Sequence, residues 1–270
     1  MSEENKRSIR ISVRNLVEFV LRSGDIDNRR SGNAQKDAML AGGRIHRKIQ
    51  KRMGSGYRAE VPLKHEVTDD EREIVLSVEG RADGIFTENG ITVIDEIKGM
   101  YTDVVRLEAP IEVHLAQAMC YGYFYCCDKD LDGIRLQLTY CDLETEEIRR
   151  FQTDRSKEEL EQWFSGVVHE YFKWARYLYH HELTRDASIR NLEFPYPYRE
   201  GQRDLVVSVY RTISRKKRLF IQAPTGIGKT LSTVFPAVRA IGEGKGDKLF
   251  YLTAKTVTRT VVEEALRILR

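Results

Sequence analysis

The sequence predicts an α/β protein built from two domains. Its 270 residues are long for one domain and about right for two, at the usual ~100 to 200 residues per domain. Segments with the alternation of strands are interspersed with segments of helical periodicity. Charge also divides the chain, since residues 186–270 hold 16 basic and 8 acidic side chains, against 28 and 33 in residues 1–185. A basic C-terminal part suits a polyanionic partner, although a solvated basic surface is the commoner cause.

The composition is that of a globular protein without a membrane span. Hydrophobic residues make up 41% and charged residues 31% of the chain, and no apolar run approaches the ~20 residues that a membrane helix needs. The N-terminus MSEENKRSIR lacks the apolar core of a signal peptide, so the expected location is the cytosol. The cysteines lack the paired spacing of a zinc site and are expected to be buried, reduced thiols: Cys120, Cys126, Cys127 and Cys141.

The first part of the chain alternates helices and strands. Ser12 can cap a helix that ends in the turn signals Ser23-Gly24-Asp25, and a second helical segment covers about 36–53. Two strand segments follow within 57–86, and the stretch ITVIDEIK predicts a third. A helix near 113–126 and a hairpin formed by IRLQLTYCDL and EEIRRFQT complete the series.

A long helix is expected next, before the second domain. Ser156 and Glu159 form a capping box at its start. Apolar residues then recur at helical spacing and are expected to face the core: Leu160, Trp163, Phe164, Val167, Val168, Tyr171, Trp174, Ala175 and Leu178. The helix should fade in the polar stretch HHELTRDASIRN, so we place the domain boundary between residues 185 and 186.

An Asn-Gly pair within GRADGIFTENGITVIDEIKG predicts a two-residue type I′ turn at Asn89-Gly90. The hairpin then places Asp83 opposite Glu96, with Lys98 on the same face one residue pair further from the turn. Opposite Cβ atoms lie ~4.5 to 5.5 Å apart, so the two carboxylates would repel each other. A Mg²⁺ or Mn²⁺ ion would remove this repulsion, and the lysine could orient a water or stabilise charge on a phosphate. An exposed hairpin with an ordinary ion-pair network is the alternative.

These residues resemble the motif of a nuclease superfamily. Asp83 and Glu96-Ile97-Lys98 are similar to the PD-(D/E)xK motif. Gly42-Gly43-Arg44-Ile45-His46 resembles the GxxxH element of the RecB-like branch, and Gln117-Ala118-Met119-Cys120-Tyr121 resembles its QxxxY element. The resemblance implies a restriction-endonuclease-like mixed sheet flanked by helices, and metal-dependent cleavage of DNA.

The same resemblance implies roles for individual residues. The implied metal ligands are His46, Asp83, Glu96 and Ile97, and the implied catalytic residues are Asp83, Glu96, Lys98, Gln117 and Tyr121. Many related nucleases hold an iron–sulfur cluster with four cysteines, one of them before the histidine. Because the first cysteine here is Cys120, we expect no iron–sulfur cluster within residues 1–270. Glu60 is a weaker candidate for the site, since strand glutamates usually face solvent.

A second motif, LFIQAPTGIGKT at residues 219–230, fits a strand, a phosphate-binding loop and the start of a helix. Ala223 takes the first position of GxxxxGK[ST], a common substitution in helicases of superfamilies 1 and 2. Backbone N–H groups near Gly226 and Gly228 can converge on phosphate oxygens, while Lys229 reaches the β- and γ-phosphates and Thr230 ligates Mg²⁺. The expected ATP-binding residues of this loop are Ala223, Pro224, Thr225, Gly226, Ile227, Gly228, Lys229 and Thr230. A glycine-rich turn that binds no nucleotide is the alternative.

The segments on either side of this loop resemble one helicase branch. FPYPYREGQ, residues 194–202, is similar to the element that precedes the loop in DinG- and XPD-like helicases of superfamily 2, where the glutamine recognises adenine. The resemblance implies that Arg199 and Gln202, at the matching positions, also bind ATP. Residues 249–266 resemble the next strand followed by motif Ia, in which Thr253, Lys255 and Thr256 could contact a single-stranded backbone. Aromatic packing between domains is the alternative for the first segment.

Together these resemblances imply a DNA nuclease fused to the first strand–loop–helix–strand segment of a RecA-like, DinG-like helicase motor, in DNA repair or replication. The implied partners are ATP with Mg²⁺ and DNA that is single-stranded or has single-stranded ends, in the cytoplasm at the nucleoid; no membrane partner is expected. No Walker B pair follows the loop, so we expect the remainder of the motor to be missing and this chain not to hydrolyse ATP. A nuclease fold that binds DNA without cutting, and a P-loop ATPase unrelated to DNA, are the alternatives.

Overall fold

The computed structural model describes residues 6–23, 33–71, 73–254 and 256–270, without the side chains of 33–40 and 256–258. Two groups predicted to contact a single-stranded nucleic-acid backbone therefore lie outside the described residues: Lys255 and the side chain of Thr256. The chain forms two compact units, Met1–Arg176 and Tyr177–Arg270, which are considered separately below. None of the described helices is both long and apolar enough to cross a membrane.

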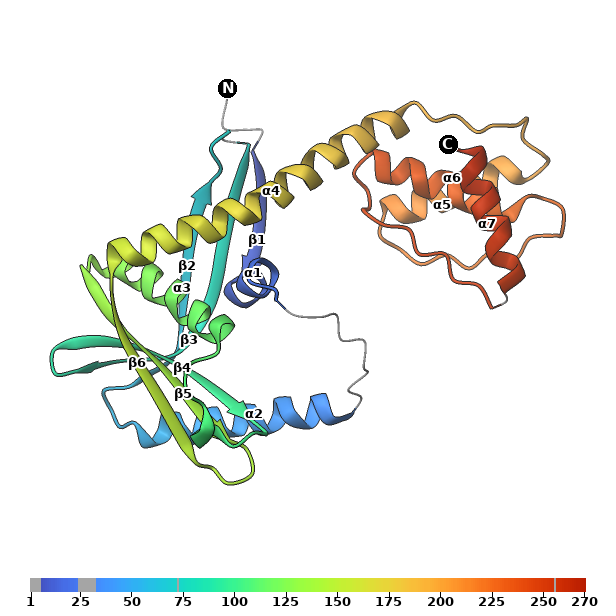
Figure 1. Cartoon of the computed structure of the whole chain (residues 1–270). Coiled ribbons are helices and arrows are strands. Elements are labelled where there is room, and N and C mark those ends of the chain that lie inside the picture. The colour runs from blue at the N-terminus through green and yellow to red at the C-terminus, as the bar shows by residue number, and fades with distance from the viewer. Residues whose placement is uncertain (1–5, 24–32, 72, 255) are drawn as a thin grey trace. The chain divides into compact units, whose positions relative to one another are not determined.

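The N-terminal unit is a mixed α/β structure with a six-stranded sheet (Figure 1). Its strands are β1 (Arg7–Ser12), β2 (Arg58–Thr68), β3 (Ile74–Glu88), β4 (Ile91–Met100), β5 (Gly133–Asp142) and β6 (Ile148–Ser156). Its helices are α1 (Val13–Val20), α2 (Asn33–Arg52), the short η2 (Val104–Arg106), α3 (Glu112–Lys129) and the first part of α4 (Lys157–Arg190). The mixed sheet flanked by helices confirms the predicted fold class at this level.

The sheet has the order β1-β3-β4-β5-β6, and β2 pairs with β3 off this path. β1 is parallel to β3 and β4 is parallel to β5, whereas the other pairs are antiparallel. Strand β3 pairs with β1 over 74–79 and with β4 over 84–88, while β2 pairs with it over 75–85. β1 and β4 therefore share one edge of β3 and leave residues 80–83 unpaired on that edge. This opening lies where the predicted site residue Asp83 is found.

The hairpin between β3 and β4 has the predicted turn and register. Asn89 and Gly90 have φ angles of 52° and 81°, as a type I′ turn requires. Ile85 pairs with Ile94, and the ladder ends at the pair Gly84–Asp95. The register was thus correct, but the backbone ladder stops one pair before the two carboxylates that it was expected to place opposite each other.

Helices cover both faces of β4. Ile97 is buried against Ile45 and Ile49 of α2, whereas the neighbouring Lys98 hydrogen-bonds to Gln117 of α3. Because successive strand residues point to opposite faces, α2 and α3 lie on opposite faces of this strand. The start of α1 matches the prediction, since Ser12 Oγ accepts a hydrogen bond of 3.1 Å from the backbone N–H of Asn15. The cysteines are free thiols: Cys120, Cys126 and Cys141 are buried, and Cys127 is partly buried.

Helix α4 starts as predicted but is longer than predicted. Ser156 and Glu159 make both hydrogen bonds of the capping box, at 3.0 and 3.2 Å. The helix does not fade after residue 178 but continues to Arg190, because HHELTRDASIRN contains no Gly or Pro to interrupt it. Leu160 and Phe164 are buried as expected, whereas Trp174 and Leu178 are 58% and 56% exposed, so their assignment to the core was wrong.

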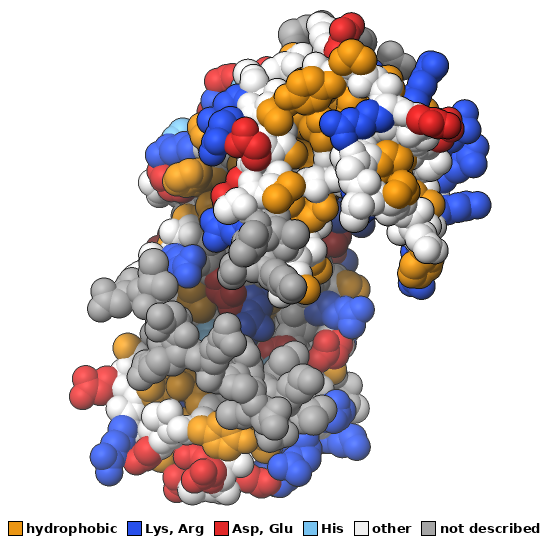
Figure 2. Space-filling view, turned by 90° about the vertical axis from the view of Figure 1, so that its right-hand side faces the viewer, with side chains coloured by type: hydrophobic (Ala, Val, Ile, Leu, Met, Phe, Trp, Pro, Cys, Tyr) orange, Lys and Arg blue, Asp and Glu red, His pale blue; other side chains and the backbone are white. Residues whose placement is uncertain are grey.

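The C-terminal unit has a helical framework made of α5 (Gln202–Ser214), α6 (Lys229–Gly242) and α7 (Thr256–Ile268). The strands predicted within 219–222 and 249–252 are absent from this described part of the chain, where both segments have no regular secondary structure. Their apolar pattern predicts strands, but a strand forms only when its N–H and C=O groups pair with a neighbour. Phe220 and Leu252 are consequently 94% and 90% exposed, and Figure 2 shows hydrophobic side chains (orange) at the surface beside Lys and Arg (blue).

Candidate functional sites

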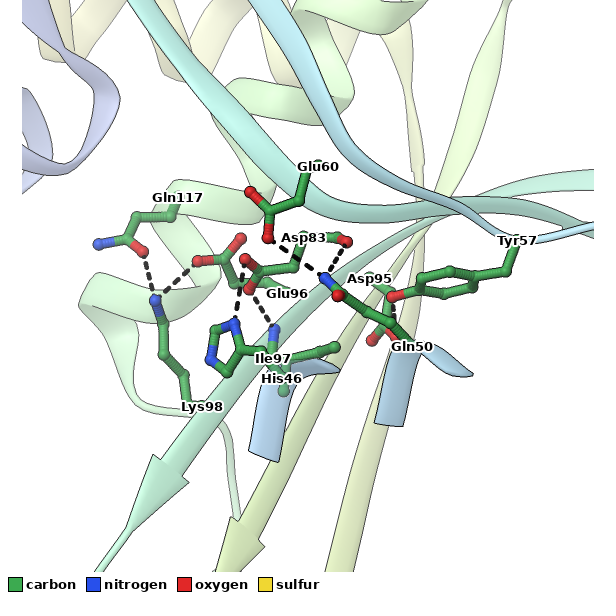
Figure 3. Close-up of polar contacts among 10 residues, drawn as sticks. All are labelled: His46, Gln50, Tyr57, Glu60, Asp83, Asp95, Glu96, Ile97, Lys98 and Gln117. Carbon is green, nitrogen blue, oxygen red and sulfur yellow. Dashed lines mark hydrogen bonds and ion pairs between the residues drawn. The ribbon is translucent and has the colours of Figure 1, made fainter. Parts of the chain in front are cut away.

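The first candidate site is formed where β3 and β4 separate (Figure 3). Asp83 Oδ2 accepts a hydrogen bond of 2.7 Å from the backbone N–H of Ile97, which replaces the next rung of the ladder. Glu96 is buried beside it and forms an ion pair with Lys98, with 2.7 Å between Oε1 and Nζ. The two carboxylates and the lysine of the predicted motif are therefore gathered in one place.

Helix α3 contributes the predicted glutamine and tyrosine. Gln117 Oε1 accepts a hydrogen bond of 2.8 Å from Lys98 Nζ, so the ammonium group is held between an amide and the Glu96 carboxylate. Tyr121 is buried one turn further along the helix, and a Cβ at Gly80 would lie 2.6 Å from its hydroxyl oxygen. Tyr121 thus packs tightly on the backbone of β3, and Gly80 is the residue that permits this approach.

Helix α2 brings His46 to the other side of Asp83. His46 Nδ1 lies 3.4 Å from Asp83 Oδ1. Burial, the largest influence, lowers the pKa of His46, but the hydrogen bond and charge of Asp83 together with Glu96 outweigh it and leave the pKa raised. Gln50, four residues later, donates to the backbone oxygen of Asp83 at 3.0 Å and to Glu60 Oε1 at 3.3 Å. Sequence reasoning missed Gln50, although its i+4 spacing from His46 was a signal.

The carboxylate oxygens of Asp83 and Glu96 and the ring nitrogen of His46 are atom types that bind hard divalent cations such as Mg²⁺ or Mn²⁺. Glu96 Oε2 is buried and has no hydrogen-bond partner among the described residues, an arrangement that is costly for a carboxylate oxygen. Burial raises the pKa of Glu96 to about 7, with a further contribution from the Asp83 charge and an opposing one from Lys98. A cation would relieve both effects. The side-chain ligand atoms of His46, Asp83 and Glu96 are, however, not all within 4.8 Å of one another, so ligation by this set stays a prediction.

A buried hydrogen-bond network supports β4 next to the site. Asp95, fully buried, accepts from Tyr57 at 3.0 Å and from Thr139 at 2.6 Å. A Cβ at Gly84 would lie 1.8 Å from the Tyr57 ring, so the tyrosine occupies the space that this glycine leaves. Burial raises the pKa of Asp95, and its hydrogen bonds oppose that shift. The network was not predicted, because its members come from β4, from β5 and from the segment just before β2.

The second candidate site is the loop that precedes α6. Gly226 and Gly228 have φ angles of 87° and 80°, and α6 begins at the next residue, Lys229. Lys229 Nζ donates to the backbone oxygens of Ala223 and Pro224 at 2.9 and 2.8 Å, so the lysine folds back over its own loop. Backbone N–H groups at a helix start, glycines with positive φ and a lysine over the loop are the geometry that phosphate recognition needs.

The segment before α5 is hydrogen-bonded to this loop. Gln202 is 5% exposed, accepts from the backbone N–H of Arg199 at 3.0 Å and donates to the backbone oxygen of Ile227 at 2.8 Å. The Arg199 guanidinium donates to the backbone oxygen of Gly226. Arg199 and Gln202, both predicted to bind ATP, therefore contact the loop itself, and a contact of Gln202 with adenine stays a prediction.

A cavity of about 810 Å³ adjoins the loop, between α6 and α7. Its lining includes Arg199 and the predicted residues Thr225, Gly226, Gly228, Lys229 and Thr230, together with Thr260 and Glu264 of α7. Ala223, Pro224 and Ile227 form the rest of the loop. A cavity of this size and position is large enough for a nucleotide.

Comparison with known proteins gives one short sequence match. No protein-family model matches the sequence. A stretch of 47 residues is 45% identical to the "Probable ATP-dependent helicase MJ0942" of Methanocaldococcus jannaschii and covers 17% of this chain but 7% of that protein. This match links the chain, over that stretch, to an archaeal ATP-dependent helicase. A solved structure is described as "Crystal structure of SSO0001". Its alignment with this chain covers 62% of this chain and 77% of the solved chain, with 18% sequence identity and a TM-score of 0.39.

Proposed function

We propose that the N-terminal unit is a metal-dependent deoxyribonuclease of the PD-(D/E)xK, RecB-like type, attached to the first part of a RecA-like, DinG-like helicase motor that binds ATP. The nuclease proposal rests on one observation above the others. Glu96 is buried beside Asp83 at the point where β3 and β4 separate, and one of its oxygens has no hydrogen-bond partner among the residues that the structure describes. The short helicase match supports the motor part.

The chain's own residues divide the chemistry between binding and charge stabilisation. Asp83, Glu96 and His46 would hold a Mg²⁺ or Mn²⁺ ion, and Ile97 could add only a backbone oxygen. When bound, such an ion lowers the pKa of a water and offsets phosphate charge. Gln117 holds the Lys98 ammonium group at the site, where its charge stabilises the extra negative charge on the phosphate oxygens during attack. Tyr121 acts by packing α3 on β3.

The test is DNA cleavage by the 270-residue chain. Labelled single-stranded and double-stranded oligonucleotides are incubated with Mn²⁺ or Mg²⁺ and the wild type, Asp83→Ala, Lys98→Ala or the control Lys64→Ala, which changes an exposed lysine of β2 paired with Glu66. We expect the wild type and the control to cut, and Lys98→Ala to be slower by roughly 100-fold or more. Equal cutting by all four proteins would show that the cleaving site lies elsewhere.

A second candidate is a nuclease fold that binds DNA without cutting. The spread of the His46, Asp83 and Glu96 ligand atoms is the observation in its favour. It predicts that none of the four proteins cuts the oligonucleotides with either metal, whereas all four bind them alike when binding is measured separately. That outcome would replace the nuclease proposal.

A further inference from the structure

Residues four apart on helix α2 share a face of the helix, and neighbouring faces contact different parts of the protein. Ile45 and Ile49 form one row and are buried against the core beneath β4. His46 and Gln50 form the next row and contact Asp83. Each residue advances ~100° around an α-helix, so the row that follows borders the site on its solvent side.

That following row is Arg47 and Lys51, both exposed. From residue 41 to residue 52 the helix has five Lys and Arg residues and no Asp or Glu. On the far side of α2, Lys48 is paired with Glu146 of the β5–β6 hairpin. Arg47 and Lys51 form no ion pair within the described part of the chain, so their charge faces solvent uncompensated.

A third cation borders the site from the sheet. Arg81 is exposed on β3 two residues before Asp83, and strand alternation places the two side chains on the same face. Arg81 also has no ion-pair partner among the residues that the structure describes. The cations come from two elements, which is unlike the continuous charged face of an ordinary solvated helix.

The cations offset the repulsion between the carboxylates of the site and the phosphates of DNA. Asp83, Glu96 and the nearby Glu60 concentrate negative charge, which repels the phosphates of a DNA strand. Uncompensated cations next to them offset this repulsion and hold the backbone at the rim. Arg47 and Lys51 are ~6 Å apart along the helix axis at ~1.5 Å per residue, and phosphates of one strand recur every ~3.4 Å of duplex axis, so the two cations can contact different phosphates of one strand.

We infer that Arg47, Lys51 and Arg81 form a phosphate-binding rim that holds the backbone of a DNA strand beside the carboxylates. The inference deepens the proposed nuclease function and rests on it for the direction of the strand toward Asp83 and Glu96. The rim binds without regard to base sequence, because cations on phosphates carry no sequence information.

The test is the salt dependence of DNA binding by the 270-residue chain. Binding of a labelled 20-nucleotide single strand and of its duplex is measured by fluorescence anisotropy at several salt concentrations in EDTA, so that cleavage does not interfere. The triple variant Arg47→Gln/Lys51→Gln/Arg81→Gln is compared with the control Lys129→Gln/Arg149→Gln/Arg155→Gln. The control removes the same charge from β6 and from the end of α3.

We expect the rim variant to reduce the slope of log K against log salt by about 2, at ~0.7 to 0.9 per phosphate contact, and to weaken binding at low salt at least ~10-fold. The control should leave the slope unchanged. Equal losses in both variants would reduce the effect to net charge, and no loss in the rim variant would overturn the inference.

Two further readouts keep the result interpretable. Thermal unfolding shows whether the rim variant is folded, and the pair Arg47→Gln/Lys51→Gln, on an exposed helix surface, replaces the triple variant if it is not. Cleavage with Mn²⁺ separates the two proposals. A wild type that binds through the rim but does not cut refutes the nuclease function alone, whereas cutting by the rim variant at the wild-type rate and affinity refutes the rim alone.

Discussion

Gln202 is expected to act on nucleotide binding through the loop rather than through the base. Its amide accepts from Arg199 N and donates to Ile227 O, and a Cβ at Gly228 would lie 2.7 Å from Nε2. Gln202→Ala removes both hydrogen bonds. At ~0.5 to 1.5 kcal/mol each, about 1 to 3 kcal/mol that holds the loop in place is lost. Affinity for a triphosphate should therefore fall by about 5- to 150-fold.

The assay compares three ligands by isothermal titration calorimetry with Mg²⁺: ATP, GTP and inorganic tripolyphosphate. A residue that positions the loop affects all three alike, because each uses the same phosphate contacts. A residue that reads adenine affects ATP alone. Gln222→Ala, an exposed glutamine just before the loop, is the control and should match the wild type. Unchanged tripolyphosphate binding with weakened ATP binding would refute our reasoning, and no binding to the wild type would refute the ATP site itself.

Three further outcomes follow from the structure. Lys229→Ala should abolish tripolyphosphate binding in the same assay while leaving the melting temperature unchanged, because the Lys229 side chain is exposed and bonds only to its own loop. Gly84→Ala should lower the free energy of unfolding by about 2 to 4 kcal/mol, since the new Cβ displaces Tyr57 from Asp95. Gly166→Ala, in open space on α4, should raise it by about 0.5 to 1 kcal/mol, and urea unfolding that gives both changes the same sign would contradict the packing argument. Burial, with Lys98 and Arg14, lowers the pKa of His114 to about 4. In the unfolded chain His114 has a pKa of about 6.5, so as the pH falls below 6.5 the unfolded chain binds a proton that the folded chain does not. The free energy of unfolding therefore decreases as the pH falls from about 6.5 toward 4, by at most about 3 kcal/mol. His114→Gln should remove this part of the pH dependence, and an equal dependence in both proteins would refute the assignment.

The hairpin was predictable from sequence because its determinants are local. Asn89-Gly90 fixes the turn, and the turn fixes the register that brings Asp83 and Glu96 together. The capping box of α4 was predictable for the same reason. The Tyr57–Asp95 contact was not, because nothing in either segment specifies which strands will become neighbours.

The two predicted strands of the C-terminal unit fail for a related reason. Continuous apolar runs such as those at 219–221 and 249–252 are typical of parallel strands buried on both faces. The apolar pattern shows that a segment could be buried in such a sheet. The segment becomes a strand only when its backbone hydrogen-bonds to a neighbouring strand. The loop and α6 form without those strands, since Gln202 and Arg199 hold the loop from the other side. The geometry of the loop is therefore more local than the motor fold in which the motif was expected.

The packing of α2 on β4 does not depend on the glycine of the GxxxH pattern. The GxxxH pattern draws attention to Gly42, yet a Cβ there would meet nothing within 4 Å. The glycine that matters for packing is Gly99, where a Cβ would lie 2.7 Å from Leu143 Cδ2 and 3.5 Å from the Cα of Gly42. Since Gly99 directly follows Lys98, the absence of a side chain there leaves room for Leu143, which packs against the cluster of Ile45 and Ile49 of α2 with Ile97 of β4. The last residue of DEIKG thus contributes, through Leu143, to the packing of α2 on β4, the helix whose His46 lies 3.4 Å from Asp83.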